Sequence, residues 1–207
     1  MKHRKSLRLI CYLTAVAGWT DAIGFLLVSH VFVSFMSGNS TQLMIAISHF
    51  NYPEIIIMLE IITSFIMGVS IGELTSHKTG DKHTFVIFCF ESLLLWITVA
   101  LIALDIPPIY FLPLLAFAMG MHNTAIKEGD TLLIKTYISG TLVSLGLSIG
   151  KALAKKQTAR KILSPLAVYF SFVLGALSGA FIAVYVSLTL SLSLLALMLS
   201  IAALKHL

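Results

Sequence analysis

Long apolar blocks separated by short polar stretches run along the whole chain. A helix needs about 20 residues to cross the roughly 30 Å hydrocarbon layer of a membrane. Six blocks are predicted to be continuous spans: Leu9–Val28, Ile55–Leu74, Phe85–Leu104, Ile109–Ile126, Ile162–Tyr185 and Ser187–Leu204. The pattern predicts an all-α polytopic membrane protein that forms a single membrane domain over residues 1–207.

Glycine and small polar residues interrupt two further apolar stretches. In Val31–Phe50 the interruption is Ser37-Gly38-Asn39-Ser40-Thr41-Gln42, and in Leu132–Gly150 it is Ser139-Gly140-Thr141. Glycine weakens a continuous helix, and small polar residues favour a fresh helix start. Because unpaired amides are costly in lipid, such breaks are tolerated only where protein or water surrounds them. The two interruptions therefore predict a shielded internal site.

The positions of lysine and arginine distinguish two topologies. Basic clusters occur at Lys2–Arg8, Lys78/Lys82, Lys127/Lys135, Lys151–Lys161 and Lys205. If both interrupted stretches enter and leave the membrane on one side, every cluster falls in the cytoplasm, in agreement with the positive-inside rule. If both stretches span, two clusters fall outside. We expect six spans plus two re-entrant segments with cytoplasmic termini, and the alternative is eight spans in two parallel repeats.

An internal repeat relates the two halves of the chain, about 9–104 and about 109–205. The residues Gly18, Ser37, Gly38, Leu43 and Ile47 recur 102 positions later as Gly120, Ser139, Gly140, Leu145 and Ile149. The residues Ser64, Gly68 and Gly72 recur 107 positions later as Ser171, Gly175 and Gly179. Three spans and one re-entrant segment per half would make the repeat inverted, and such transporters bind their substrate near the midplane. Chance similarity between Gly- and Leu-rich helices is the alternative.

Composition and charge agree with a membrane protein and exclude several other classes. Hydrophobic residues make up 58% and charged residues 11% of the chain, whereas soluble domains carry about one-quarter charged residues. The net charge of +5 follows from the cytoplasmic clusters, so no nucleic-acid partner is expected. Cys11 and Cys89 lie in apolar blocks without a metal-ligand spacing. We expect no enzyme activity, no metal and no cofactor, because no catalytic motif is present.

Ionisable residues inside the apolar blocks are the first functional candidates. Asp21 lies about 12 residues, or ~18 Å, beyond Leu9. A carboxylate at a helix centre costs about 2.5–3.5 kcal/mol on insertion scales, so Asp21 needs a partner or a ligand. A hydrogen bond to the neighbouring broken segment is the structural alternative. Asp21, Glu60 and Glu91 are candidates for a proton relay, and pairing with a hydroxyl or a lysine explains the two glutamates equally well.

The candidate solute path joins the first block, both interrupted segments and the fourth block. Its residues are Trp19, Thr20, Asp21, Ser37, Gly38, Asn39, Ser40, Thr41, Gln42, His122, Asn123, Ser139, Gly140 and Thr141. Each segment would start a half-helix whose free N–H groups attract a polar or anionic solute. The simpler explanation is that these residues cap and pack the half-helices.

The leading hypothesis is a small secondary transporter or channel for a small polar or anionic solute, with a midplane site at the repeat interface. The alternative is a non-transporting membrane component that supports assembly or signalling through helix packing. The expected partners are membrane lipid and the solute, and an oligomer is compatible with the sequence.

Four short motifs together resemble a known family. They are Gly18-Trp19-Thr20-Asp21-Ala22, Val31–Asn39, Gly120-Met121-His122-Asn123 and Lys135–Thr141. The set resembles the YoaK-like family of bacterial inner-membrane proteins over nearly the whole chain. Members usually carry threonine where Ser37 and Ser139 stand here, and commonly glutamine in place of His122. The resemblance implies a location in the bacterial plasma membrane and no established activity, because the family is a domain of unknown function.

Overall fold

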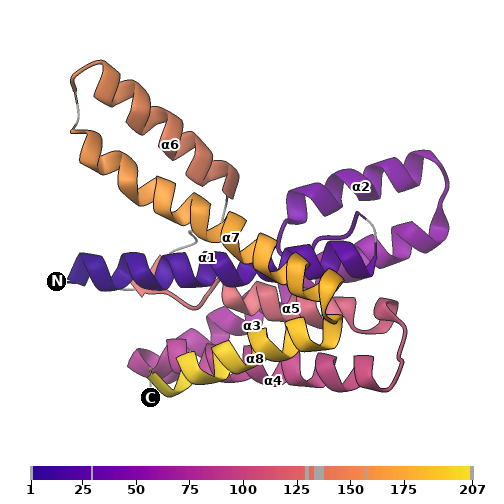
Figure 1. Ribbon diagram of the computed structural model, residues 1–207. Helices are drawn as coiled ribbons and strands as arrows, with labels where there is room; N and C mark the ends of the chain where they lie inside the picture. The colour runs from indigo at the N-terminus through magenta and orange to yellow at the C-terminus, as the bar shows by residue number, and fades with distance from the viewer. Residues whose placement is uncertain (1, 29, 129–130, 133–137, 157, 206–207) are drawn as a thin grey trace.

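The computed structural model describes all residues except 1, 29, 129–130, 133–137, 157 and 206–207 (Figure 1). Within the described part, the α-helices are Lys2–Leu27 (α1), Met36–Ser48 (α2), Tyr52–Thr79 (α3), His83–Ala103 (α4), Leu112–His122 (α5), Ile138–Leu153 (α6), Leu163–Tyr185 (α7) and Leu188–Lys205 (α8). The shorter elements are the 3-10 helices Gly80–Lys82 (η1), Pro108–Tyr110 (η2) and Ala159–Ile162 (η3), and an antiparallel hairpin of Lys127–Glu128 (β1) and Thr131–Leu132 (β2). The predicted helical class is confirmed.

Four helical stretches in the described chain are long and apolar enough to cross a membrane. They are Leu7–Leu27, Tyr52–Ala103, Arg160–Tyr185 and Leu188–Lys205, and the second contains both α3 and α4. Two shorter apolar helices, Pro108–His122 and Ile138–Leu153, accompany them. Five of the six predicted blocks therefore coincide with one helix each.

The sixth predicted block, Ile109–Ile126, is not one helix. Its α-helical part, α5, has 11 residues, and at 1.5 Å per residue this is roughly 16 Å, about half of a membrane span. Side chains of α4 hold the chain that follows α5: His83 Nε2 bonds the Thr124 carbonyl at 2.7 Å, and Thr84 Oγ1 donates to the Ala125 carbonyl at 2.8 Å. These tertiary bonds take up carbonyls that a longer helix would pair internally, so the helix ends early.

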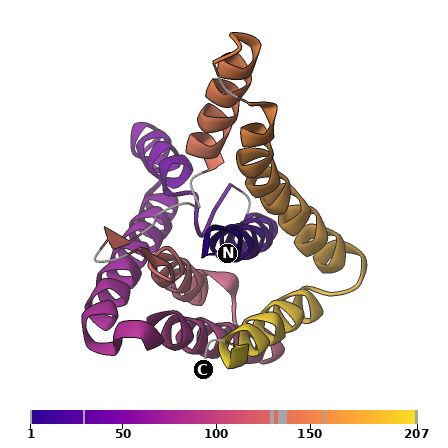
Figure 2. The same ribbon diagram turned by 90° about the vertical axis from the view of Figure 1, so that its left-hand side faces the viewer.

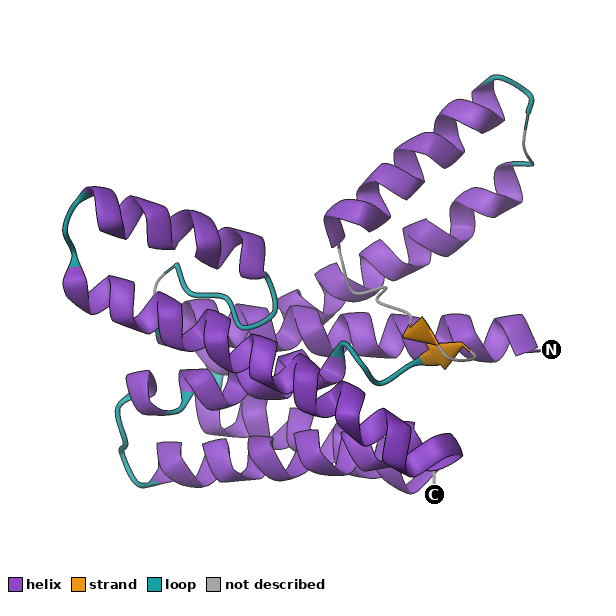
Figure 3. Ribbon diagram, turned by 180° about the vertical axis from the view of Figure 1, so that it is seen from behind, coloured by secondary structure: helices purple, strands orange, loops and turns teal. Residues whose placement is uncertain are grey.

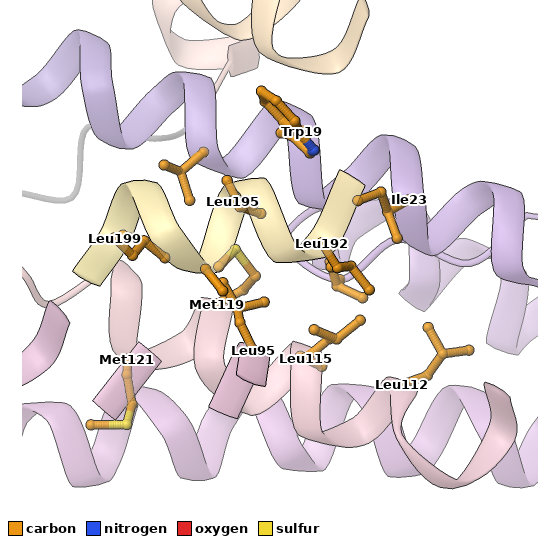
Figure 4. Close-up of a cluster of buried hydrophobic side chains, with 14 of the residues drawn as sticks. Trp19, Ile23, Leu95, Leu112, Leu115, Met119, Met121, Leu192, Leu195 and Leu199 are labelled. Carbon is orange, nitrogen blue, oxygen red and sulfur yellow. The ribbon is translucent and has the colours of Figure 1, made fainter. Parts of the chain in front are cut away.

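The helices pack mainly in three pairs: α1 with α7, α3 with α5, and α4 with α8. Large buried side chains of α1, α4, α5 and α8 meet in the core (Figure 4). Eight of the eleven residues of α5 are buried, so this short helix is central. In contrast, α6 has no buried residue.

The connections between helices gather at two opposite ends of the bundle. Figures 1 and 2 show both chain termini at one end, with η1, the hairpin and the α6–α7 connection. The α2–α3, α4–α5 and α7–α8 connections lie at the other end. The described lysines and arginines all belong to segments near the first end, whereas the predicted basic residue Lys135 lies outside the described residues.

The interrupted stretch Val31–Phe50 contains a helix start where the sequence predicts one, at Met36. In the second stretch, α6 is described from Ile138 onward, directly after residues 133–137, which lie outside the described residues. In Figures 1 and 3, α2 and α6 diverge from the region where α1 and α7 cross and run toward opposite ends of the bundle. The chain therefore contains two short helices that point in opposite directions.

Candidate functional site

The carboxylate of Asp21 holds the non-helical segment that precedes α2. Its Oδ1 accepts hydrogen bonds from the backbone N–H groups of Val33 (2.9 Å) and Ser34 (2.7 Å), and its Oδ2 accepts one from the Ser34 hydroxyl (2.6 Å). Asp21 is 4% exposed. Hydrogen bonds to a charged acceptor are stronger than those to a neutral one, so Asp21 fixes the returning chain against α1. This contact agrees with the structural alternative for Asp21, a hydrogen bond to the neighbouring broken segment.

Asn39 holds the same segment from the other side. Its Nδ2 donates to the Phe32 carbonyl at 2.6 Å, and its Oδ1 accepts from the Phe32 N–H at 3.0 Å. The side chain is fully buried. The side-chain amide thus bonds both the N–H and the carbonyl of a single residue, Phe32. It replaces the hydrogen bonds that a strand or helix would supply. Asp21 and Asn39 therefore make the break before α2 a defined structure.

The side chains that precede Asp21 on α1 also bond within the protein. Trp19 Nε1 donates to Ser191 Oγ at 2.9 Å, and Ser191 Oγ donates to the Gly179 carbonyl at 3.0 Å, which joins α1, α7 and α8. Thr20 Oγ1 donates to the Val16 carbonyl of its own helix. Trp19 and Thr20 are buried, so they contribute rigidity near the start of α2.

The polar residues at the starts of α2 and α6 differ from the interior groups because they are accessible. Ser37, Ser40, Thr41, Ser139 and Gly140 are exposed, and Gly38, Gln42 and Thr141 are half-buried. The hydroxyls of Ser40 and Thr41 donate to carbonyls one turn back in α2. A hydroxyl oxygen keeps acceptor capacity after it donates. These residues are the exposed part of the predicted path.

A buried pair of ionisable side chains joins α4 to α5. His122 Nδ1 lies 2.5 Å from Glu91 Oε1, and His122 Nε2 lies 2.9 Å from the Leu13 carbonyl of α1. Both ionisable side chains are 0% exposed. Asn123, the next residue, is half-buried and donates to the Met119 carbonyl. The two predicted candidates Glu91 and His122 thus form one unit at the centre of the bundle.

Glu60 lies in a different environment from Glu91. It is exposed and lines an open groove between α3 and the start of α5. The other residues of the groove are Leu59, Thr63, Ser64, Ile109, Tyr110 and Pro113. The structure does not bring Glu60 together with Asp21 or with Glu91, so a continuous relay through the three carboxylates is not formed.

Two glycines make the crossing of α1 and α7 unusually close. A Cβ atom on Gly18 would overlap the carbonyl oxygen of Phe172, and one on Gly175 would overlap the carbonyl oxygen of Ala15. Small residues at a helix interface let the backbones approach and add dispersion contacts, which drive helix association in lipid.

The crossing of α3 and α5 has the same construction. A Cβ on Gly68 would overlap the carbonyl oxygen of Phe117, and one on Gly120 would overlap that of Phe65. In each crossing, each helix contributes one glycine and one carbonyl to the contact. Four of the glycines that recur in the sequence, Gly18, Gly68, Gly120 and Gly175, are therefore in direct contact with the partner backbone.

Sequence reasoning missed three parts of this region. The contact of His122 with Glu91 joins residues 31 positions apart, and no local pattern indicates it. Tyr12, whose buried hydroxyl has no hydrogen-bond partner among the described residues, faces the same pair. The bond between Trp19 and Ser191 joins residues 172 positions apart. Buried polar residues in apolar helices were the available signal, but the partners depend on how the helices pack.

Comparison with known proteins identifies the family. The model of the family described as "Protein of unknown function (DUF1275)" matches residues 9–204. The chain is 29% identical over 163 residues to the UPF0700 transmembrane protein YoaK of Bacillus subtilis (strain 168), which covers 72% of this chain and 70% of that protein.

A second relative is the UPF0700 transmembrane protein RA0705 of Rhizobium meliloti (strain 1021). The chain is 28% identical to it over 155 residues, covering 73% of this chain and 66% of that protein. No solved structure matches the chain significantly. Its long apolar helices and these relatives make the chain a multi-pass membrane protein. Because the family model spans nearly all of it, the chain belongs to the DUF1275 family of proteins of unknown function.

Proposed function

We propose that this protein is a small secondary transporter or channel that moves a small polar or anionic solute past the starts of α2 and α6. One observation carries the proposal: two short helices, α2 and α6, lie near the crossing of α1 and α7 and run in opposite directions (Figure 1). Non-helical backbone at membrane depth is costly unless protein encloses it or water reaches it. Asp21 and Asn39 enclose one such segment, which implies that the break serves a purpose.

The glycine contacts support an inverted repeat. The glycine on α1 and that on α5, Gly18 and Gly120, are 102 residues apart. Gly68 and Gly175, on α3 and α7, are 107 residues apart, and the carbonyl partners obey the same two offsets. Chance similarity between apolar helices does not require corresponding residues to make corresponding contacts. In this interpretation, the first helix of each half packs against the second span of the other half, α7 or α3.

The proposed topology has six crossings, made by α1, α3, α4, α5 together with the non-helical chain that follows it, α7 and α8, and two re-entrant helices, α2 and α6. The lysines and arginines near one end of the bundle support a cytoplasmic location for that end, and with it for both termini. In this arrangement α2 re-enters from the outside and α6 from the cytoplasm. The resemblance to bacterial relatives supports the plasma membrane as the location.

The chemistry of the helix starts favours a polar or anionic solute. At α2 the N–H groups of Met36, Gly38 and Asn39 already bond the carbonyls of Ser34 and Phe35, so the attraction for an anion comes from the partial positive charge of the helix N-terminus. The exposed hydroxyls of Ser37, Ser40 and Ser139 add neutral donors and acceptors. None of these exposed positions carries a cysteine, carboxylate or histidine side chain, the usual nucleophiles and bases. This favours binding and passage of a solute over its chemical conversion.

Accessibility of the helix starts to water tests the proposal without knowledge of the solute. In a background with Cys11→Ala and Cys89→Ala, we expect Ser40→Cys and Ser139→Cys to react with a charged, membrane-impermeant methanethiosulfonate reagent. Ser40→Cys reacts from the outside and Ser139→Cys from the cytoplasmic side. Reaction requires a thiolate and a charged reagent to meet, and a lipid environment disfavours both ions.

Ser70→Cys is the matched control. Ser70 is exposed on α3 and bonds the carbonyl one turn back, as Ser40 does on α2. We expect Ser40→Cys to react at least about tenfold faster than Ser70→Cys, because only the former meets water. Equal rates at Ser40 and Ser70 would remove the aqueous path. Solute passage is then measured by osmotic swelling of proteoliposomes in formate, acetate, nitrate, urea and glycerol.

A non-transporting membrane component is the second candidate. The observation in its favour is that Asp21, Asn39 and Trp19 all have protein partners, as expected of residues that only stabilise the fold. It predicts no accelerated swelling in any of these solutes, and unreactive cysteines at both helix starts.

A further inference from the structure

The contact between Glu91 and His122 contains a proton whose position the hydrogen-bond chemistry restricts. The Leu13 carbonyl accepts hydrogen bonds and cannot donate, so His122 Nε2, 2.9 Å away, carries a hydrogen. The 2.5 Å contact between His122 Nδ1 and Glu91 Oε1 needs one more proton, on either the nitrogen or the oxygen. The pair thus holds one proton that can reside on either residue, and in both forms it is neutral overall.

The pair also has an unused acceptor. Glu91 Oε2 is buried and has no hydrogen-bond partner among the described residues. The hydroxyl of Tyr12, buried and also without a partner there, lies within electrostatic range of Glu91. A buried carboxylate oxygen without a donor is costly. A purely structural pair would satisfy both oxygens, as the carboxylate of Asp21 does with its three donors.

Few other ionisable groups surround the pair. From α1 the titratable side chain that faces it is Tyr12. The residues of α8 buried against α4 are serine, leucine and alanine, and those buried on α3 are methionine, isoleucine, glycine and serine. His83 lies two helical turns before Glu91 on α4 and bonds the Thr124 carbonyl. A charge on the pair is therefore not balanced by a fixed neighbour among the described residues.

We propose that Glu91 and His122 form a proton-binding site that couples proton movement to passage of an anionic solute. Uptake of one proton converts the neutral pair into a protonated Glu91 beside an imidazolium, with a net charge of +1. An anion at the starts of α2 and α6 balances that charge, and release of both restores the neutral pair. Helix α1 connects the two places, because Leu13 and Asp21 are eight residues, or roughly 12 Å, apart on it.

The coupling role rests on the proposed transport function, whereas the proton site itself is tested without transport. Protein labelled with 13C-glutamate is placed in lipid nanodiscs, and infrared difference spectra are recorded between about pH 5 and pH 9. We expect a glutamate carboxyl transition that disappears in Glu91→Gln. It shifts in His122→Gln, which retains a donor for the Leu13 carbonyl, and it is unchanged in the control Glu60→Gln.

Each outcome decides one of the two proposals. A transition of the same size in wild type and Glu91→Gln overturns the proton site. If Glu91→Gln does not fold, the wild-type spectrum decides, because a wild type without any glutamate transition in this range also overturns the site. A Glu91-dependent transition together with no solute-driven swelling supports the proton site and contradicts transport. Swelling in formate that is equally fast in wild type and His122→Gln rejects the coupling.

Discussion

Gly175→Ala is expected to destabilise the protein by about 1–3 kcal/mol, a loss typical of overpacked interiors. The added methyl group overlaps the carbonyl oxygen of Ala15 on α1, and a backbone atom cannot move aside as a flexible side chain does. The α1–α7 crossing must therefore widen, which removes dispersion contacts along both helices. Thermal unfolding of the detergent-purified protein, followed by intrinsic tryptophan fluorescence, measures the loss. Gly68→Ala at the α3–α5 crossing is expected to cause a loss of similar size.

Gly146→Ala is the matched control, with the opposite sign expected. Gly146 lies in α6, and a Cβ atom there meets no other atom within 4 Å. Alanine is better than glycine inside a helix by about 0.5–1 kcal/mol, so this variant should be slightly more stable than wild type. If Gly175→Ala and Gly146→Ala shift the unfolding temperature equally, the close crossing of α1 and α7 is wrong.

Asp21→Asn is expected to release the segment before α2 and to cost on the order of 3 kcal/mol, because hydrogen bonds to a charged group contribute about 1.5–3 kcal/mol each. The carboxylate accepts three hydrogen bonds, from Val33 N–H and from both the N–H and the hydroxyl of Ser34. Asparagine keeps one acceptor oxygen for the two N–H groups, but that oxygen is neutral, and its NH2 group replaces the oxygen that accepted the Ser34 hydroxyl. Amide hydrogen exchange of residues 31–35 should accelerate strongly, and the unfolding temperature should fall.

Asp81→Asn provides the control for this change. Asp81 is exposed in η1, at the end of the bundle near the termini, so the same substitution should leave both measurements within experimental error of wild type. Protection of residues 31–35 that survives in Asp21→Asn would show that Asn39 alone holds the segment.

The start of α2 was predictable because its signal is local. Glycine and hydroxyl side chains interrupt an apolar stretch at Ser37, and the helix starts one residue earlier, at Met36. The early end of α5 was not predictable. Asn123 and Thr124 bond carbonyls of the last turn through their side chains, but such residues also occur within helices. The chain after them is held by His83 and Thr84, more than 35 positions away.

The candidate site was predictable in its members and not in its pairings. Glu60 and Glu91 lie at similar depths in their apolar blocks, so the sequence made them equal candidates for a proton relay. Depth does not say which side of a helix faces the interior. Both α3 and α4 are apolar nearly all round, so their sequences carry no marked polar face. Only the packing of α4 against α5 distinguishes Glu91, buried beside His122, from Glu60, exposed in a groove.

The α1–α7 crossing has a consequence for synthesis of the protein. Gly18 meets a carbonyl that lies 154 positions later, at Phe172, and ribosomes add about 5–20 residues per second. The first helix to enter the bilayer therefore waits roughly 8–30 s for its partner at that rate. During this interval its glycine surface faces lipid or the insertion machinery, where membrane proteases can act on it. Slow codons between these two helices should consequently lower the yield of folded protein.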